Sequence, residues 1–192
     1  LLMEQPMQFE ISTEEMAKAK VPHELFLTNL VGNHILWFVA SLGIFGSFWQ
    51  PMAMVPVISL LILGYTLLRA RRERNGSSWY VMCHWQIVAR RSLVFMGVIM
   101  LLIVIASLGW IGYSYLGMKK VAVLALIGGA GLLPTLVSVL ILIVMESDAM
   151  YQASQGKLSD AVYQRFPNPD ARILEDAALD LDDIKQAYNS TD

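Results

Sequence analysis

The sequence predicts an all-α integral membrane protein with four transmembrane helices arranged as two hairpins. Three long segments contain no Asp, Glu, Lys or Arg: residues 25–68, 92–118 and 121–145. A hydrocarbon core about 30 Å thick is crossed by roughly 20 helical residues. The first segment therefore has room for two crossings and a tight turn, and each of the others has room for one. Six arginines between residues 69 and 91 separate the second crossing from the third.

The composition also favours a membrane protein. Hydrophobic residues make up 56% of the chain, charged residues only 16%, and the mean hydropathy is +0.52. Soluble domains carry about 25% charged residues. The net charge of −2 gives no basis for binding nucleic acid, and the single cysteine excludes an intramolecular disulfide and a thiolate metal cluster. Five glutamates occupy the first 25 residues, so we expect no cleavable secretory signal.

The charge distribution divides the chain into three parts. We expect a cytoplasmic N-terminal tail at residues 1–24, a membrane domain at residues 25–145 and an acidic cytoplasmic C-terminal tail at residues 146–192. Short amphipathic helices are expected in both tails. The four spans are expected at residues 25–48, 52–68, 92–111 and 121–145, with a basic cytoplasmic loop at residues 69–91.

Particular residues indicate where the spans begin and end. Trp49 is suited to the membrane interface, and Pro51 to the start of the second span. Ser77 or Ser78 is expected to cap a helix that continues past the last two arginines into the third span. Small residues and a proline predict a bend or a close helix contact in the fourth span: Gly128, Gly129, Gly131 and Pro134.

Basic residues predict the orientation. With four spans, the side that holds both tails and the arginine segment has twelve Lys and Arg residues, and the opposite side has two, Lys119 and Lys120. Basic residues stay on the cytoplasmic side, so both termini are expected in the cytoplasm, at a bacterial inner membrane. The arginines are expected to determine this topology and to contact anionic headgroups of the cytoplasmic leaflet. They are Arg69, Arg71, Arg72, Arg74, Arg90 and Arg91.

The tails offer surfaces for partners. Residues 169–188 are expected to form an acidic helix with an apolar stripe made by Leu174, Leu181, Ile184 and Tyr188. Anionic lipid repels such a helix, so its stripe is expected to dock on protein; a solvated tail is the alternative. In the N-terminal tail, Thr13 is expected to cap a short helix that ends at Pro22.

Three polar residues, Asn29, Asn33 and His34, lie in the cytoplasmic half of the first predicted span. Lipid supplies no hydrogen-bond partner, so they form either a ligand, ion or proton site or an interhelical contact, and the second interpretation is preferred. A haem held by His34 and His84 is not expected, because their depths differ. No metal or other cofactor is expected either, because no carboxylate or thiolate cluster accompanies these histidines.

The remaining motifs give no support for catalysis. No Asp, Glu, Lys or Arg lies in the middle of any predicted span, which weighs against a self-sufficient pump. There is no P-loop, no nucleophile elbow and no zinc-protease motif. We expect a non-catalytic structural or assembly subunit of a multiprotein inner-membrane complex, such as a secretion or conjugation machine or a respiratory complex. Its partners would be other subunits or further copies of itself.

Two other functions remain open. The first is a small oligomeric channel or transporter with Asn29, Asn33 and His34 near its lumen. The second is a membrane enzyme with a lipid-linked substrate, for which the sequence has no motif.

Overall fold

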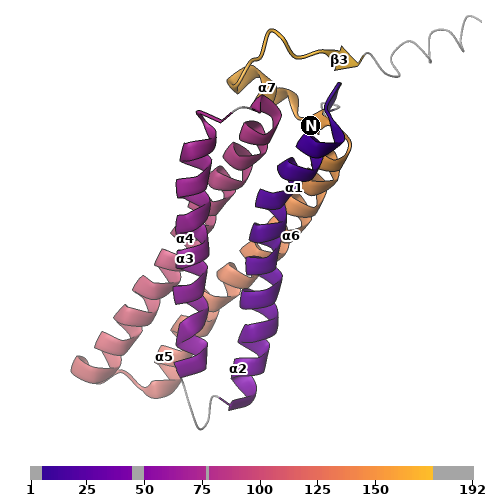
Figure 1. Ribbon diagram of the computed structural model, residues 1–192. Helices are drawn as coiled ribbons and strands as arrows, with labels where there is room; N and C mark the ends of the chain where they lie inside the picture. The colour runs from indigo at the N-terminus through magenta and orange to yellow at the C-terminus, as the bar shows by residue number, and fades with distance from the viewer. Residues whose placement is uncertain (1–5, 45–49, 77, 175–192) are drawn as a thin grey trace, which may run out of the picture.

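A computed structural model describes residues 6–44, 50–76 and 78–174, and these residues are mostly helical (Figure 1). Three helical runs are long and apolar enough to cross a membrane. They are α3 (Gln50–Glu73), α4 (Trp79–Tyr115) and the run from α5 (Lys120–Leu126) through η2 (Ile127–Leu132) to α6 (Leu133–Ser154). A further run precedes them and comprises α1 (Thr13–Thr28), η1 (Asn29–Trp37) and α2 (Phe38–Ile44). Both η segments are π-helical, with wider turns than an α-helix.

A small sheet joins the segments that flank the bundle. Strand β1 (Met7–Phe9) lies between β2 (Lys157–Leu158) and β3 (Ile173–Leu174), and both pairings are antiparallel. Helix α7 (Asp160–Arg165) lies between β2 and β3 in the chain. The segment before α1 and the segment after α6 therefore meet at one end of the bundle, which we call the head (Figure 1).

Serine side chains cap the N-termini of two helices, α1 and α4. Ser78 caps α4 by accepting a hydrogen bond from the amide of Val81. This confirms the prediction that Ser77 or Ser78 caps this helix. The prediction of Thr13 as the cap of the first helix is wrong, because Ser12 accepts from the amide of Glu15. The prediction that this helix ends at Pro22 is also wrong. Pro22 is buried inside α1, and packing of the residues that follow it outweighs the one backbone bond that a proline removes.

The arginine segment differs from the expected loop at residues 69–91. Helix α3 continues to Glu73 and α4 begins at Trp79, so only a short turn separates them. Arg71 and Arg72 occupy the last turn of α3, where positive charge is favourable to the helix dipole. The helices therefore extend past the uncharged segments at this end and carry the arginines with them.

The core joins helices that are distant in the sequence. Helix α1 packs on both α4 and α6, and α3 packs mainly on α4. The phenyl rings of Phe26 and Phe95 meet at the centre, with 6.1 Å between their centroids. Gly131 confirms the predicted close contact in the fourth run, since a Cβ there would lie 2.8 Å from the Leu102 side chain.

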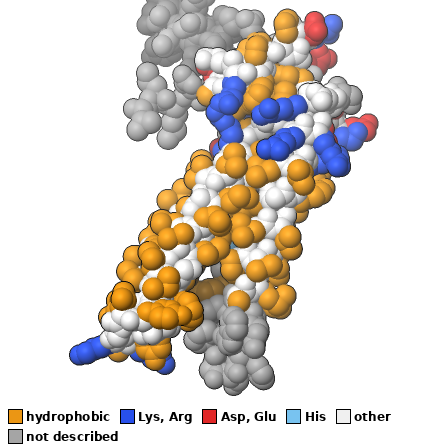
Figure 2. All heavy atoms as spheres, turned by 90° about the vertical axis from the view of Figure 1, so that its left-hand side faces the viewer, with side chains coloured by type: hydrophobic (Ala, Val, Ile, Leu, Met, Phe, Trp, Pro, Cys, Tyr) orange, Lys and Arg blue, Asp and Glu red, His pale blue; other side chains and the backbone are white. Residues whose placement is uncertain are grey.

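The outer surface of the bundle is apolar. In Figure 2, hydrophobic side chains cover the length of the face shown, and Lys and Arg side chains gather in a band just below the head. Exposed leucines, valines and aromatic residues occur on every long run of the described chain. Contact with lipid explains this surface, because exposing so large an apolar area to water would be unfavourable.

The C-terminal tail departs from its predicted helix. The residues from 169 to 174 are not helical, and Ile173–Leu174 form strand β3 instead, because the backbone of β1 offers them hydrogen bonds. Leu174 is 40% exposed at the edge of the sheet. Leu181, Ile184 and Tyr188 lie outside the described residues.

Candidate functional site

Four ionisable side chains from three helices meet inside the bundle, near the head. His23 comes from α1, His84 and Arg91 from α4, and Glu146 from α6. Glu146 and His23 are 0% exposed and His84 is 1% exposed. A buried carboxylate is tolerated only where partners compensate for its lost hydration. The site is therefore defined by what surrounds Glu146.

Both carboxylate oxygens of Glu146 have a partner. Oε1 lies 2.8 Å from a guanidinium nitrogen of Arg91, which also donates to the backbone carbonyl of Met145 at 3.0 Å. Oε2 lies 2.5 Å from Nδ1 of His23. Nε2 of His23 lies 2.9 Å from Nδ1 of His84. The result is a continuous chain of hydrogen bonds that ties α1, α4 and α6 together.

The partners assign the protons along this chain. Glu146 requires a proton on Nδ1 of His23, so a neutral His23 accepts at Nε2 from Nδ1 of His84. Nε2 of His84 is then a buried lone pair with no partner among the described residues. The arrangement holds an ion pair of Glu146 and Arg91 beside two hydrogen-bonded histidine rings. None of these four residues lines the pocket of about 340 Å³ in the head or the pocket of about 460 Å³ between α1, α3 and α4.

Sequence reasoning missed this site for a specific reason. Glu146 and His23 both fall just outside the uncharged segments, so the sequence places them in the two predicted cytoplasmic tails. The sequence related His84 only to His34, as a haem pair that is not expected, whereas the structure places His84 against His23. The useful signal was that α1 and α6 continue as helices past the ends of those segments, which brings flanking charges onto buried faces.

The three polar residues of the first run form a second network. Asn29 donates to the hydroxyl of Ser59 at 2.9 Å, and Nε2 of His34 lies 2.8 Å from the same hydroxyl. Asn33 donates to the backbone carbonyl of Val55 at 2.8 Å and to Asn29 at 3.2 Å. All three are buried. They make an interhelical contact between η1 and α3 within one chain.

The π-helical turn of η1 explains how all three residues reach α3. In an α-helix, Asn29 and Asn33 share a face, while His34 points about a quarter-turn away. In a π-helix the repeat is longer, so Asn29, Asn33 and His34 lie on one side. The ring of His34 also packs against Phe95, with 4.9 Å between centroids. The sequence did not predict η1 or the participation of Ser59.

The arginines have different environments. The guanidinium of Arg69 lies 2.8 Å from Glu73 and 6.0 Å from the centre of the Trp85 ring, and Arg74 donates to Gln86. Arg91 turns inward to Glu146. The side chains of the remaining three arginines are exposed: Arg71, Arg72 and Arg90.

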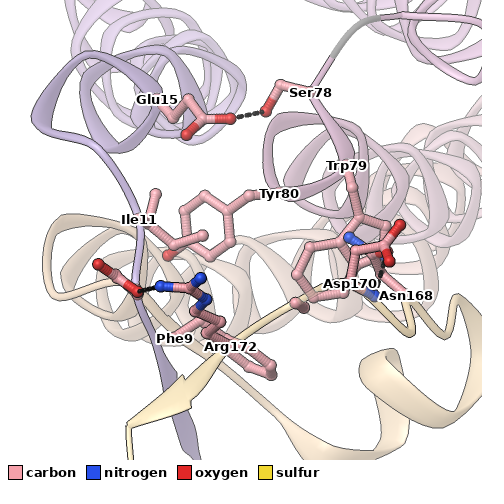
Figure 3. A pocket seen from close by; sticks show the side chains of 11 residues that line it. Phe9, Ile11, Glu15, Ser78, Trp79, Tyr80, Asn168, Asp170 and Arg172 are labelled. Carbon is pink, nitrogen blue, oxygen red and sulfur yellow. Dashed lines mark hydrogen bonds and ion pairs between the residues drawn. The ribbon is translucent and has the colours of Figure 1, made fainter.

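The head holds a polar pocket of about 340 Å³ between β1, the start of α4 and the segment before β3 (Figure 3). At its wall, Ser78 donates to Glu15 at 2.8 Å, and Ser12 donates to the other carboxylate oxygen at 3.0 Å. These bonds, the one from Ser78 first, hold the pKa of Glu15 below its usual range. The Glu15 carboxylate therefore links Ser12 and Ser78, the residues that cap α1 and α4.

Replacement of Glu15 by Gln is expected to alter the acid stability of the head. A lowered pKa in the folded state means that the carboxylate stabilises the fold above the unfolded pKa of 4.5, and that this contribution disappears as the pH falls through the folded pKa. Glu15→Gln should therefore be less stable at neutral pH and lose less stability below pH 4.5. Thermal unfolding at a series of pH values measures this difference, and a parallel pH profile for the two proteins would contradict it.

Comparisons with models of known protein families, with characterised proteins and with solved structures found no match to this chain.

Proposed function

We propose that the chain crosses a bacterial inner membrane four times, with both termini in the cytoplasm, and serves as a non-catalytic structural or assembly subunit of a larger membrane complex. The exposed edge of the head carries this proposal. Strand β3 lies at the edge of the sheet and presents Ile173 and Leu174 at 45% and 40% exposure. An exposed apolar edge strand can pair with another chain. It also leads directly into the acidic tail that follows.

The position of the two ends supports four crossings. Strand β1 pairs with both β2 and β3, so the segments before and after the bundle lie at the same end (Figure 1). The turn at Gly117, which has a positive φ of 65°, lies at the opposite end between α4 and α5. An even number of crossings fits this arrangement, so the run from α1 to α2 is a span in addition to the three long runs.

Reporter fusions test the orientation. A fusion at Asp192 is expected to be cytoplasmic, and a fusion at Gly117 is expected on the opposite side, because twelve Lys and Arg residues would lie on the cytoplasmic side against two on the other. Paired reporters, one active only inside and one only outside, measure both positions in the same strain. A C-terminus that is accessible from outside intact cells would rule out this topology.

The proposed docking segment comprises strand β3 and the acidic residues 175–192 that follow it. A cytoplasmic partner is tested by changing this segment while the rest of the head is kept. Deletion of residues 175–192 leaves the sheet intact, whereas deletion from residue 169 would also remove β3. The deletion, Leu174→Asp and Leu181→Asp are each expected to preserve insertion and to lose the partner on affinity purification in mild detergent. Each well-buried leucine contributes about 1.5–3 kcal/mol to such a contact.

Asp148→Asn is the matched control, because it changes an exposed charge on α6 away from the sheet. Retention of every partner by all three test variants would refute the docking role of this segment.

The buried polar contacts favour a scaffold over the channel alternative. That alternative placed Asn29, Asn33 and His34 near a lumen shared between subunits. Their bonds to Ser59 and to the Val55 carbonyl satisfy them inside one chain, so they need no lumen water. The ties between α1, α4 and α6 at Glu146 likewise support a rigid bundle.

A further inference from the structure

A second pocket, of about 460 Å³, opens where the apolar bundle meets the head. Its walls come from α1, α3 and α4, and they combine both signs of charge with one indole ring. The lining residues that matter here are Glu14, Glu15, Lys18, Arg69, Glu73 and Trp85. The uncharged segment of the sequence ends at Leu68, directly before Arg69. The pocket therefore lies at the level where phospholipid headgroups would meet the protein.

The charges of this pocket select against an anionic ligand. Two basic side chains face three carboxylates, so the lining has an excess of one negative charge. Hydrogen bonds keep these groups ionised: Lys18 lowers the pKa of Glu14, Glu14 raises the pKa of Lys18, and Ser78 lowers the pKa of Glu15. A ligand with one phosphate and one ammonium complements this mixture, because each of its charges finds opposite charges in the lining.

Contacts with Trp85 and Glu73 position the guanidinium of Arg69 at the pocket. Its guanidinium lies over the buried ring of Trp85 and 2.8 Å from Glu73, yet its side chain remains 46% exposed. The Glu73 side chain is only 18% exposed. A cation and a carboxylate are thus fixed side by side at the pocket, with free hydrogen-bonding capacity on the guanidinium.

The surface below Arg69 fits an acyl chain. Leu61, Tyr65 and Leu68 follow one another at helical spacing on α3, and their exposures are 70%, 55% and 60%. This apolar strip leads along the bundle to the pocket. A molecule that filled both would have a charged head and a long apolar tail.

We propose that this pocket binds the headgroup of a zwitterionic phospholipid with a primary ammonium, such as phosphatidylethanolamine. The phosphodiester contacts Lys18 and Arg69, the ammonium contacts Glu73 and the neighbouring carboxylates, and one acyl chain lies on the strip below Arg69. This site rests on the proposed placement in a membrane and is independent of the partner on the head. It differs from the general attraction of anionic lipid to the exposed arginines.

Native mass spectrometry of the full chain tests the site. The protein is released from vesicles that contain equal amounts of dioleoyl phosphatidylethanolamine and dioleoyl phosphatidylglycerol, and the retained lipid is counted. The wild type is expected to retain phosphatidylethanolamine in preference. Arg69→Gln and Glu73→Gln are each expected to lower that retention roughly two- to fivefold. Arg69→Lys, which preserves the charge, should retain more than Arg69→Gln.

Arg71→Gln is the matched control, because Arg71 is exposed on the same helix and does not line the pocket. Equal retention of the two lipids by the wild type, or an equal loss in Arg71→Gln, overturns the proposal. Displacement of the lipid by an equal concentration of glycerophosphoethanolamine would overturn the role of the acyl chain.

The same variants separate this site from the docking proposal. If Arg69→Gln and Glu73→Gln release a protein partner while phosphatidylethanolamine retention is unchanged, the pocket is a protein contact and the lipid proposal is wrong. If the deletion of residues 175–192, Leu174→Asp and Leu181→Asp all leave every partner bound while lipid selectivity persists, the docking proposal alone fails.

Discussion

Replacement of Glu146 by Ala is expected to destabilise the bundle by about 3–5 kcal/mol, the cost of removing one partner from a buried ion pair. Arg91 would lose its carboxylate, and Nδ1 of His23 would lose its acceptor, both inside the protein. Thermal unfolding in a mild detergent measures the loss. Asp148→Ala is the matched control, because it removes an exposed carboxylate from the same helix two residues further on.

A compensated variant separates the charge effect from the loss of packing. Glu146→Leu combined with Arg91→Met removes both charges and keeps most of the volume, and such replacements are often neutral or stabilising. We expect this double variant to be clearly more stable than Glu146→Ala. If Glu146→Ala unfolds at the same temperature as Asp148→Ala, the cluster does not hold the three helices together.

Replacement of Ser59 by Ala is expected to cost about 1–2 kcal/mol, near the upper end for hydrogen bonds between membrane helices. The hydroxyl of Ser59 contacts both Asn29 and His34, so its loss leaves two buried polar groups without that partner. The change in the free energy of unfolding is measured from the populations of folded and unfolded protein in mixed detergent micelles.

Ser107→Ala supplies the control for that substitution. Ser107 is exposed on α4, and its hydroxyl donates only to the carbonyl of Ile103 within the same helix. We expect a negligible change there. A Ser59→Ala protein that is as stable as Ser107→Ala, but that changes the permeability of proteoliposomes, would favour the channel function over the scaffold.

Composition and charge spacing were sufficient to predict a mostly helical chain with helices long and apolar enough to cross a membrane. A helix satisfies its own backbone hydrogen bonds in lipid, so three long uncharged segments, with an arginine cluster between the first two, favour helices. The sequence therefore predicted a helical membrane protein, the cap at Ser78 and the close contact near Gly131, and the structure confirms helices long and apolar enough to span a membrane. These features depend on residues close together in the chain.

Tertiary structure decided which polar groups meet. The contact of Glu146 with Arg91 and His23 joins residues more than fifty positions apart, and no local pattern specifies it. The π-helical turns of η1 place Asn29, Asn33 and His34 on the side that faces α3. There the Val55 carbonyl accepts from Asn33, and the Ser59 hydroxyl bonds to Asn29 and His34. Strand β3 forms at a position with a helical pattern because β1 offers it a backbone partner. Local sequence determined the long apolar helices, whereas hydrogen bonding between buried polar groups determined which faces of those helices meet.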